Sequence, residues 1–395
     1  MLKDIGSACT ACRACAEGCP VNVISFKEDD YGMLYPHVDI NKCIQCNICN
    51  KVCHVQTDIL NNSIRKNYAG YSLAEEKNKS ASGGICSALY QYALDKNWKT
   101  FGVVYDINTG AQYIEITDQN DIGRVKNSKY VYSDMSICFK KIREYLDAEQ
   151  IILFIGLPCQ VAALKSYIQV FNRNLSNLYL IEIICHGIAP EVYLNKHIAS
   201  IEAKYKRKAD QLSFRDPEFG TKNYVFSLRT NNKVFYKCND IRTDAYQLGY
   251  HNAIIYRENC YQCKYAKKDR VSDLVLGDWY YDGNAPKVVF DDENISSILC
   301  CSDKGEQLLE LLLLEKRICI SERPISEVIN VQTTLTNPHE KNIVREKFLL
   351  EYKKTGDFDE SMKKVYLSQM IKNEIKYHLK IRQIKQLIKK IIGIS

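Results

Sequence analysis

The chain has 395 residues and a formal net charge of +7, and its 46% hydrophobic and 26% charged residues are ordinary for a globular protein of two or three domains. Residues 363–395 carry nine lysines and arginines against one glutamate, so the rest of the chain is nearly neutral and a broad nucleic-acid-binding surface is excluded. The eighteen cysteines are the unusual feature.

These cysteines are expected to be reduced. The first residues lack the basic and apolar regions of a secretory signal, so we expect a cytoplasmic protein rather than a disulfide framework. No apolar stretch approaches the roughly 20 residues that a membrane-spanning helix needs. The sequence therefore predicts no transmembrane helix.

The first domain, expected over residues 1–58, is an internal repeat of cysteines spaced x2, x2 and x3, with the two runs 34 residues apart. Three closely spaced thiolates can hold one face of an iron-sulfur cube, while the fourth of each run reaches the other cluster. The sequence therefore predicts two 4Fe-4S clusters, one held by Cys9, Cys12, Cys15 and Cys53 and the other by Cys43, Cys46, Cys49 and Cys19.

Zinc is the alternative to these clusters, because zinc also binds sets of cysteine thiolates. The repeat is similar to bacterial two-cluster ferredoxins, which implies an α+β ferredoxin-like fold. His54 stands where the ferredoxin pattern has proline. This departure is expected to affect the turn after Cys53 more than ligation.

The second domain, expected over residues 69–335, begins with small residues before a helix with one apolar face. A helix start of this kind exposes backbone N–H groups to an anion such as a cofactor phosphate, although such residues commonly serve only as a helix cap. The small residues are Ser80, Ser82, Gly83 and Gly84, and the apolar face has Ile85, Leu89, Tyr92 and Ala93.

Two later segments share the order strand, cysteine-containing loop, helix. Residues 151–155 precede Cys159, and residues 178–184 precede Cys185. This alternation predicts an α/β domain with a mostly parallel sheet, in which the loops after the strands gather at one edge. A single cysteine in such a loop is commonly a buried core residue. Two in matching loops, together with a later CxxC pair, favour a shared site.

The remaining segments complete the expected architecture. Residues 211–237 alternate apolar and polar side chains around Asn231-Asn232, which predicts a β-hairpin inserted in the α/β domain, and one more strand and helix follow Ile295. A helical C-terminal region is expected over residues 336–395. Its basic amphipathic tail is typical of a helix that lies on the inner face of a membrane, or of one docked on protein.

Five motifs occur in order along the chain: SASGGICSALYQYAL, KNSKYVYSD, FIGLPCQVAALK, IEIICHG and YRENCYQCKYAKKDRVSDLVLGDW. Together they resemble the coenzyme F420 hydrogenase/dehydrogenase beta-subunit family, in particular bacterial members with a fused N-terminal ferredoxin domain. The resemblance runs from the first cysteines to about Trp279. It departs after Asp278, where family members often read GDFWG and this chain has Trp279-Tyr280-Tyr281.

The resemblance implies a protein that binds FAD beside iron-sulfur clusters. Carried over by position, the flavin lies near Ser82, Gly83, Gly84, Asn127, Ser128, Lys129 and Tyr130, and a third 4Fe-4S cluster is ligated by Cys159, Cys185, Cys260 and Cys263. Lys129 and His186 are candidate catalytic residues, and Arg257 is a candidate phosphate ligand. A salt bridge for Lys129 and a turn cap for His186 are the alternatives. The other cysteines are expected to be packing residues: Cys86, Cys138, Cys238, Cys300, Cys301 and Cys319.

The sequence thus predicts an iron-sulfur flavoprotein oxidoreductase, because FAD takes up two electrons together and passes them on singly to clusters. Its partner would be a redox protein or a small-molecule electron donor, not nucleic acid. The alternative is a non-catalytic, ferredoxin-type electron-delivery subunit. Nothing in the residues identifies a deazaflavin pocket.

Overall fold

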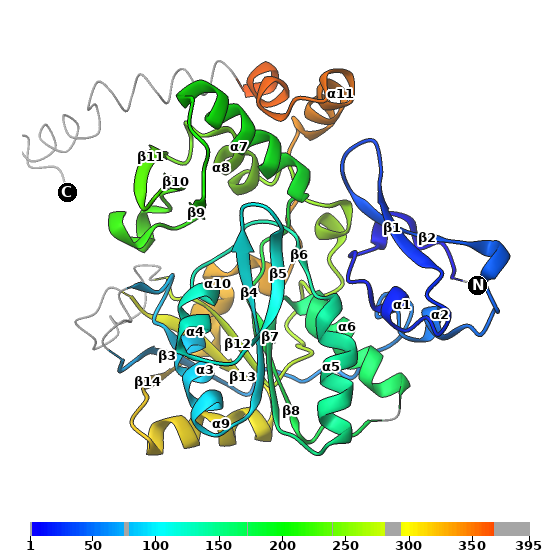
Figure 1. The fold of residues 1–395 in the computed structure, drawn as a ribbon. Helices are drawn as coiled ribbons and strands as arrows, with labels where there is room; N and C mark the ends of the chain where they lie inside the picture. The colour runs from blue at the N-terminus through cyan, green and yellow to red at the C-terminus, as the bar shows by residue number, and fades with distance from the viewer. Residues whose placement is uncertain (1, 75–78, 172, 239, 281–293, 367–395) are drawn as a thin grey trace, which may run out of the picture.

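A nine-stranded mixed sheet forms the centre of the protein, with a small N-terminal module on one side and a helical layer above it (Figure 1). The computed structural model describes residues 2–74, 79–171, 173–238, 240–280 and 294–366. None of the helices within these ranges is long and apolar enough to cross a membrane. The basic tail lies outside the described residues from 367 onward.

The N-terminal module repeats its backbone conformation as well as its cysteines. Ala11 and Arg13 have positive φ angles of 56° and 68°, and Gln45 and Asn47, each 34 residues later, have 54° and 64°. These residues adopt the left-handed conformation and reverse the chain direction just before two short helices. An antiparallel hairpin lies between the two helices. The elements are η1 (Gly6–Ala8), α1 (Ala14–Glu17), β1 (Ile24–Glu28), β2 (Leu34–Val38), η2 (Ile40–Lys42) and α2 (Ile48–Lys51).

The large sheet has the order β14-β3-β13-β12-β8-β7-β4-β5-β6. Its strands are β3 (Lys66–Ser72), β4 (Lys99–Asp106), β5 (Gly110–Ile116), β6 (Ser133–Asp134), β7 (Ile152–Gly156), β8 (Leu178–Ile183), β12 (Leu274–Asp278), β13 (Ser296–Cys300) and β14 (Ile318–Arg323). The four central strands β12, β8, β7 and β4 are parallel. The predicted strands before Cys159 and Cys185 are β7 and β8.

The prediction of a mostly parallel sheet was too broad. The strands β13, β3 and β14 add to one side in antiparallel orientation, and β5 pairs antiparallel with β4 on the other. The short connection at residues 107–109 makes β5 antiparallel to β4, because a connection of this length can only reverse the chain beside the strand that it leaves. Within the described ranges, parallel pairing is confined to strands that have at least one helix between them in the chain, including β5 with β6.

Helices cover both faces of this sheet (Figure 1). Alternate residues of β12 point to opposite faces of the sheet. Leu274 and Leu276 belong to the hydrophobic core on one face, and Val275 belongs to the core on the other face. The first face carries α3 (Ile85–Asp95), α4 (Gln119–Val125) and α9 (Asp303–Leu314), and the second carries α5 (Ser136–Asp147), α6 (Pro158–Val170) and α10 (Ile325–Val331). The predicted apolar face of α3 is buried.

The helix after β7 begins earlier than predicted. Pro158 occupies its first turn, where a fixed φ and a missing N–H carry no cost. Cys159 therefore lies in the first turn of α6 rather than in the loop before it.

The helical layer above the sheet contains the predicted hairpin. Asn231 and Asn232 form its two-residue turn with φ angles of 50° and 63°, as a type I′ turn requires. A third strand extends the hairpin into the order β11-β10-β9. The layer comprises α7 (Glu191–Tyr205), β9 (Gln211–Ser213), η4 (Pro217–Phe219), η5 (Thr221–Asn223), β10 (Ser227–Thr230), β11 (Lys233–Lys237), α8 (Ala245–His251) and α11 (Arg345–Thr355), with η6 (Glu258–Gln262) and η7 (Thr333–Leu335) below it.

A buried histidine joins three parts of this layer. His197 of α7 lies 3.0 Å from Asp244, which caps α8, and 2.9 Å from Asp359, which follows α11. The imidazole is 3% exposed. Burial opposes its charge, but the two carboxylates outweigh burial and raise the pKa of His197 to about 10.

Replacing His197 should therefore destabilise the protein in a pH-dependent way. His197→Gln leaves two buried carboxylates facing each other, so the free energy of unfolding should fall by roughly 3–5 kcal/mol near neutral pH. Because the pKa is raised on folding, the contribution is complete below about pH 6.5 and is lost as the pH rises through about 10. Anaerobic thermal unfolding across this range measures the difference, with exposed His37→Gln as the control. A variant that loses the same stability at every pH would contradict the ion-pair explanation.

Candidate cluster and cofactor site

The eight cysteines of the N-terminal repeat divide between two cavities. One is lined by Cys9, Cys12, Cys15 and Cys53, and the other by Cys19, Cys43, Cys46 and Cys49. Each cavity thus receives three thiols of one repeat and the last thiol of the other, which is the grouping expected for cubane clusters.

The thiols of the first cavity, Cys9, Cys12, Cys15 and Cys53, lie close enough to affect one another. Burial raises the pKa of Cys12 to about 12, and neighbouring Cys9 and Cys53 add to the shift. Burial likewise raises the pKa of Cys15, with Cys12, Cys9 and Cys53 adding to it. No three His, Cys, Asp or Glu side chains of the described ranges converge tightly enough to ligate a single metal ion. A cubane instead binds each thiolate at a separate iron, so it requires a cavity lined by thiols.

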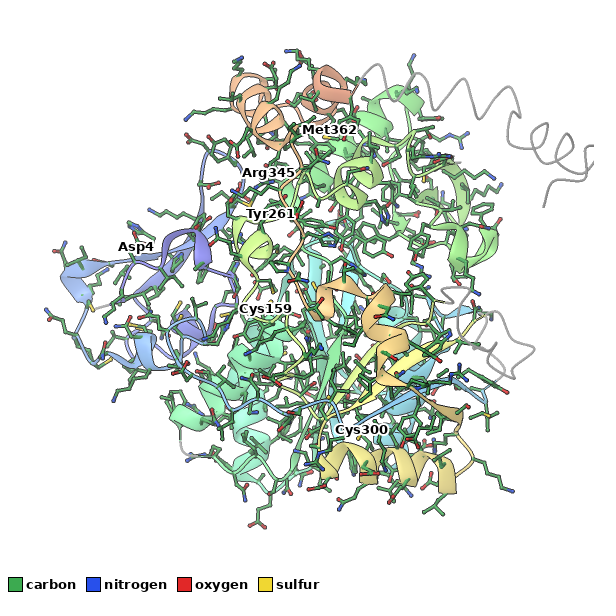
Figure 2. The ribbon with its side chains drawn as sticks, turned by 180° about the vertical axis from the view of Figure 1, so that it is seen from behind. Asp4, Cys159, Tyr261, Cys300, Arg345 and Met362 are labelled. Carbon is green, nitrogen blue, oxygen red and sulfur yellow. The ribbon has the colours of Figure 1, made fainter. Side chains whose placement is uncertain are left out.

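A third cavity brings together the four cysteines that were predicted from three separate segments. Cys159 lies in the first turn of α6, Cys185 follows β8, and Cys260 and Cys263 lie on and after η6. The cavity sits beyond the carboxyl ends of β7 and β8, where ligands of α/β sheets bind. Figure 2 shows Cys159 between the N-terminal module and the sheet.

A buried ion pair holds the segments of this third cavity together. Glu182, at the end of β8, and Arg270, seven residues after Cys263, are 0% and 2% exposed. The Arg270 Nε donates to Glu182 over 2.9 Å, and Nη1 donates to the carbonyl oxygens of Tyr265 and Lys267. The other Glu182 oxygen accepts from the Val271 N–H. The pair therefore fixes the loop after the CxxC motif against β8, the strand that precedes Cys185.

A larger cavity of about 240 Å³ lies beside the third thiol cavity. Ser82, Gly84, Asn127, Ser128, Lys129 and Tyr130 line it, as expected from the resemblance, together with Ser80 and Cys86. The two cavities share a wall formed by Leu157, Ile184, Cys185, His186, Gly187 and Ile188. A group bound in the larger cavity would therefore lie next to the ligands of the third cavity.

Two polar atoms of the larger cavity suit a bound cofactor. The Ser80 Oγ and the Asn127 Oδ1 are buried and have no hydrogen-bond partner among the described residues. Buried polar groups are normally paired, so these atoms are available to a polar ligand. The start of α3, with Gly84 at a φ of 79°, faces the same space. The residues present fit a flavin nucleotide with a polar, phosphate-bearing part.

Gly83 serves packing rather than the cavity. It is not among the lining residues, and a Cβ there would lie 2.5 Å from the Gly70 carbonyl oxygen and 2.7 Å from the Ser296 nitrogen. Its small size allows the loop before α3 to approach β3 and β13. Ser82 also contacts this edge, because its hydroxyl donates to the carbonyl oxygen of Ile295.

Lys129 lines the larger cavity but directs its ammonium group at the protein. Nζ donates to the carbonyl oxygens of Val125, Lys126 and Asn127 at distances of 2.8, 2.7 and 3.1 Å. Burial lowers the pKa of Lys129 to about 7. These contacts cap the end of α4 and shape the loop that carries Asn127. The structure therefore favours a positioning role for Lys129 over a phosphate contact, and the expected salt bridge is not formed within the described part of the chain.

The other two candidates face different surroundings. His186 lines both cavities, and its Nδ1 lies 3.4 Å from Nε2 of His339, a residue without any spacing signal in the sequence. Burial lowers the pKa of His186. Arg257 is 2% exposed and its Nη2 donates to the carbonyl oxygens of Cys9 and Leu34. Arg257 therefore attaches the N-terminal module to the body instead of facing a phosphate.

Sequence comparisons agree with this organisation. The model for the C-terminal part of the coenzyme F420 hydrogenase/dehydrogenase beta subunit matches residues 149–326, and a 4Fe-4S dicluster domain matches residues 8–57. The chain thus matches the coenzyme F420 hydrogenase/dehydrogenase beta-subunit family over residues 149–326 and carries a 4Fe-4S dicluster domain before that region. The match to the expected family is thus confirmed, and the N-terminal match is to an iron-sulfur domain.

Two relatives show the distance within the family. The F420-dependent formate dehydrogenase subunit beta of Methanocaldococcus jannaschii is 22% identical over 237 residues, and the F420-dependent formate dehydrogenase 1 subunit beta of Methanococcus maripaludis is 24% identical over 238 residues. Each match covers 59% of this chain and 55% of the relative, so the chain spans about half the length of these curated relatives.

A chain of the xenon-derivatized F420-reducing NiFe hydrogenase complex from Methanosarcina barkeri is a structural neighbour. It has a TM-score of 0.41 and 15% identity, and the match covers 77% of this chain and 91% of that one.

The Glu182–Arg270 pair generates a prediction. Glu182→Ala leaves an uncompensated buried arginine, so the free energy of unfolding should fall by roughly 3–5 kcal/mol. Iron bound at the third cavity should be lost first, because the loop after Cys263 loses its anchor. Denaturant titration and iron per chain are the measurements. Glu182→Gln, which keeps an acceptor for the Val271 N–H, should retain more iron, and equal iron loss from all sites would contradict this explanation.

Proposed function

We propose that the protein is an iron-sulfur flavoprotein oxidoreductase that passes electrons between 4Fe-4S clusters and FAD, to or from a two-electron substrate. The observation that carries this proposal is the shared wall of the two cavities, in which Cys185 belongs to both. A cofactor that exchanges two electrons with a substrate can pass them singly to a cluster only if the cofactor and the cluster lie close together.

The arrangement of the cysteines supports an order of electron transfer. The second N-terminal set, which lines the cavity with the exposed Cys46, is the outermost. The first set lies between the second set and the body, and it consists of Cys9, Cys12, Cys15 and Cys53. Burial raises the pKa of Cys159, and its neighbours in the third set and Cys12 add to the shift. Cys12 of the first set therefore approaches the third set. The resulting order is outer set, first set, third set, larger cavity.

The chain's own residues would hold the cofactor and limit its surroundings. Ser80 and Asn127 offer polar groups, the start of α3 offers N–H groups to a phosphate, and Tyr130 and Tyr250 close one side with stacked rings 4.7 Å apart. FAD, when bound, supplies the exchange between paired and single electrons. Lys129 holds the loop of Asn127 in place. These roles supersede a direct catalytic role for Lys129.

The relatives suggest the reaction class and the partners. Both are named as F420-dependent formate dehydrogenase subunits, so a deazaflavin-type hydride carrier is one candidate substrate class and a redox protein is a candidate partner. The second candidate function is a non-catalytic electron-delivery subunit, which is favoured by the naming of both relatives as subunits. Bound FAD that a small-molecule donor reduces would exclude this second function.

Removing half of the third cysteine set tests the cluster. Cys260→Ser with Cys263→Ser should lower the iron content by about four per chain and leave the N-terminal clusters in place. The control is Cys300→Ser, because this thiol is buried and lies away from the three cavities, as Figure 2 shows. Iron is measured after anaerobic purification. Unchanged iron in the double variant would overturn the third cluster.

Cofactor binding tests the larger cavity. The protein should contain or take up about one FAD per chain, and Asn127→Ala should weaken FAD binding about tenfold because one buried hydrogen bond is lost. Asn120→Ala, on the exposed side of neighbouring α4, is the control. Binding is followed by quenching of flavin fluorescence. A protein with its full iron content that does not bind FAD would refute the flavoprotein proposal.

A further inference from the structure

The contact between the first and third cysteine sets consists of two side chains from distant parts of the sequence. His54 follows Cys53 and lines the first cavity, while Tyr265 follows Cys263 by two residues and lines the third. They are 0% and 5% exposed. His54 is the residue that departs from the ferredoxin pattern, and no role in ligation accounts for it.

Hydrogen bonds fix His54 on both sides. Its Nε2 is hydrogen-bonded to the Thr10 hydroxyl over 2.9 Å, and its Nδ1 is hydrogen-bonded to the Tyr265 hydroxyl over 2.5 Å. The two ring centroids are 5.6 Å apart. Thr10 lies between Cys9 and Cys12, so the chain of contacts begins inside the first cysteine repeat and ends beside the third set.

The backbone around both residues is also anchored. The Lys264 Nζ donates to the carbonyl oxygens of His54 and Thr57 at 3.1 and 2.8 Å. The Arg270 of the buried ion pair donates to the carbonyl oxygen of Tyr265. Burial raises the pKa of Tyr265, and thiols of both sets add to the shift, namely Cys159, Cys12, Cys263 and Cys53. Tyr265 therefore occupies the space between the two sets rather than one side of either.

We propose that His54 and Tyr265 are positioning residues that hold the first and third cysteine sets at a fixed separation and thereby set the rate of electron transfer between their clusters. This inference rests on the proposed function. One electron leaves the reduced cluster and enters the oxidised one, while the imidazole and the phenol keep their protons and no bond is broken.

The N-terminal module has further attachments, so losing this contact should not release it. The Arg257 Nη2 donates to two carbonyl oxygens of the module, and the Tyr132 hydroxyl donates to the carbonyl oxygen of Ala11 over 2.9 Å. Tyr132 thus makes the same kind of bond across the same interface. Burial raises the pKa of Tyr132, and the charged groups that shift it are Asp134, Arg13 and Arg257. It provides a matched control for Tyr265.

The test compares four variants of the full chain with all clusters loaded. Tyr265→Phe removes one hydroxyl, His54→Pro restores the ferredoxin pattern, His54→Asn keeps a hydrogen-bonding group near the Nδ1 position, and Tyr132→Phe is the control. The N-terminal clusters are reduced rapidly with a low-potential donor, and freeze-quench EPR follows the appearance of the reduced third cluster. EPR of the fully reduced protein reports the magnetic interaction between the first and third clusters.

Tyr265→Phe and His54→Pro should keep the wild-type iron content and midpoint potentials but slow the transfer roughly tenfold to a hundredfold, because small displacements of reacting groups have effects of this order. The magnetic interaction should weaken in both. Tyr132→Phe should match the wild type, and His54→Asn should be faster than His54→Pro. Wild-type rates and coupling in Tyr265→Phe and His54→Pro would overturn the inference. Unchanged iron in the Cys260 and Cys263 double variant would instead overturn the third cluster itself.

Discussion

The buried ion pair of Glu182 and Arg270 is the interaction on which the arrangement of the site depends. A buried charge pair is stable only when its remaining hydrogen-bonding groups also find partners. Here Arg270 donates to the Tyr265 carbonyl oxygen and Glu182 accepts from the Val271 N–H, both after the CxxC motif. The loop is thereby held against β8, next to Cys185. The third thiol cavity, the position of Tyr265 and the wall of the larger cavity all follow from this attachment.

The same contacts join an N-terminal module to a body that belongs to a different family of domains. The module supplies two cavities lined by thiols, and the body supplies a sheet edge with two adjacent cavities. Electron transfer between separate sites requires that the sites be close and rigidly placed. Arg257, Tyr132 and the His54–Tyr265 contact provide that placement through hydrogen bonds to the module's backbone and side chains.

Several features could be read from the residues in advance. The cysteine repeat, the strands before Cys159 and Cys185, and the Asn231-Asn232 turn depend on local spacing and local conformation, and the structure contains the predicted repeat, strands and turn. The sheet was less predictable, because antiparallel partners such as β3 and β13 are separated by more than two hundred residues and carry no pairing signal. The backbone contacts of Lys129 were not predictable either, since spacing does not show which way an ammonium group points.

The sequence by itself determined the chemistry, because thiol spacing and family motifs are local properties of the chain. It predicted which cysteines group together and, through the family resemblance, segments that line the larger cavity. Only the tertiary structure decided how these groups relate in space. The partners of Glu182 and the bond between His54 and Tyr265 arise from contacts between distant segments. Such contacts depend on the packing of the whole fold, and no short stretch of residues contains them.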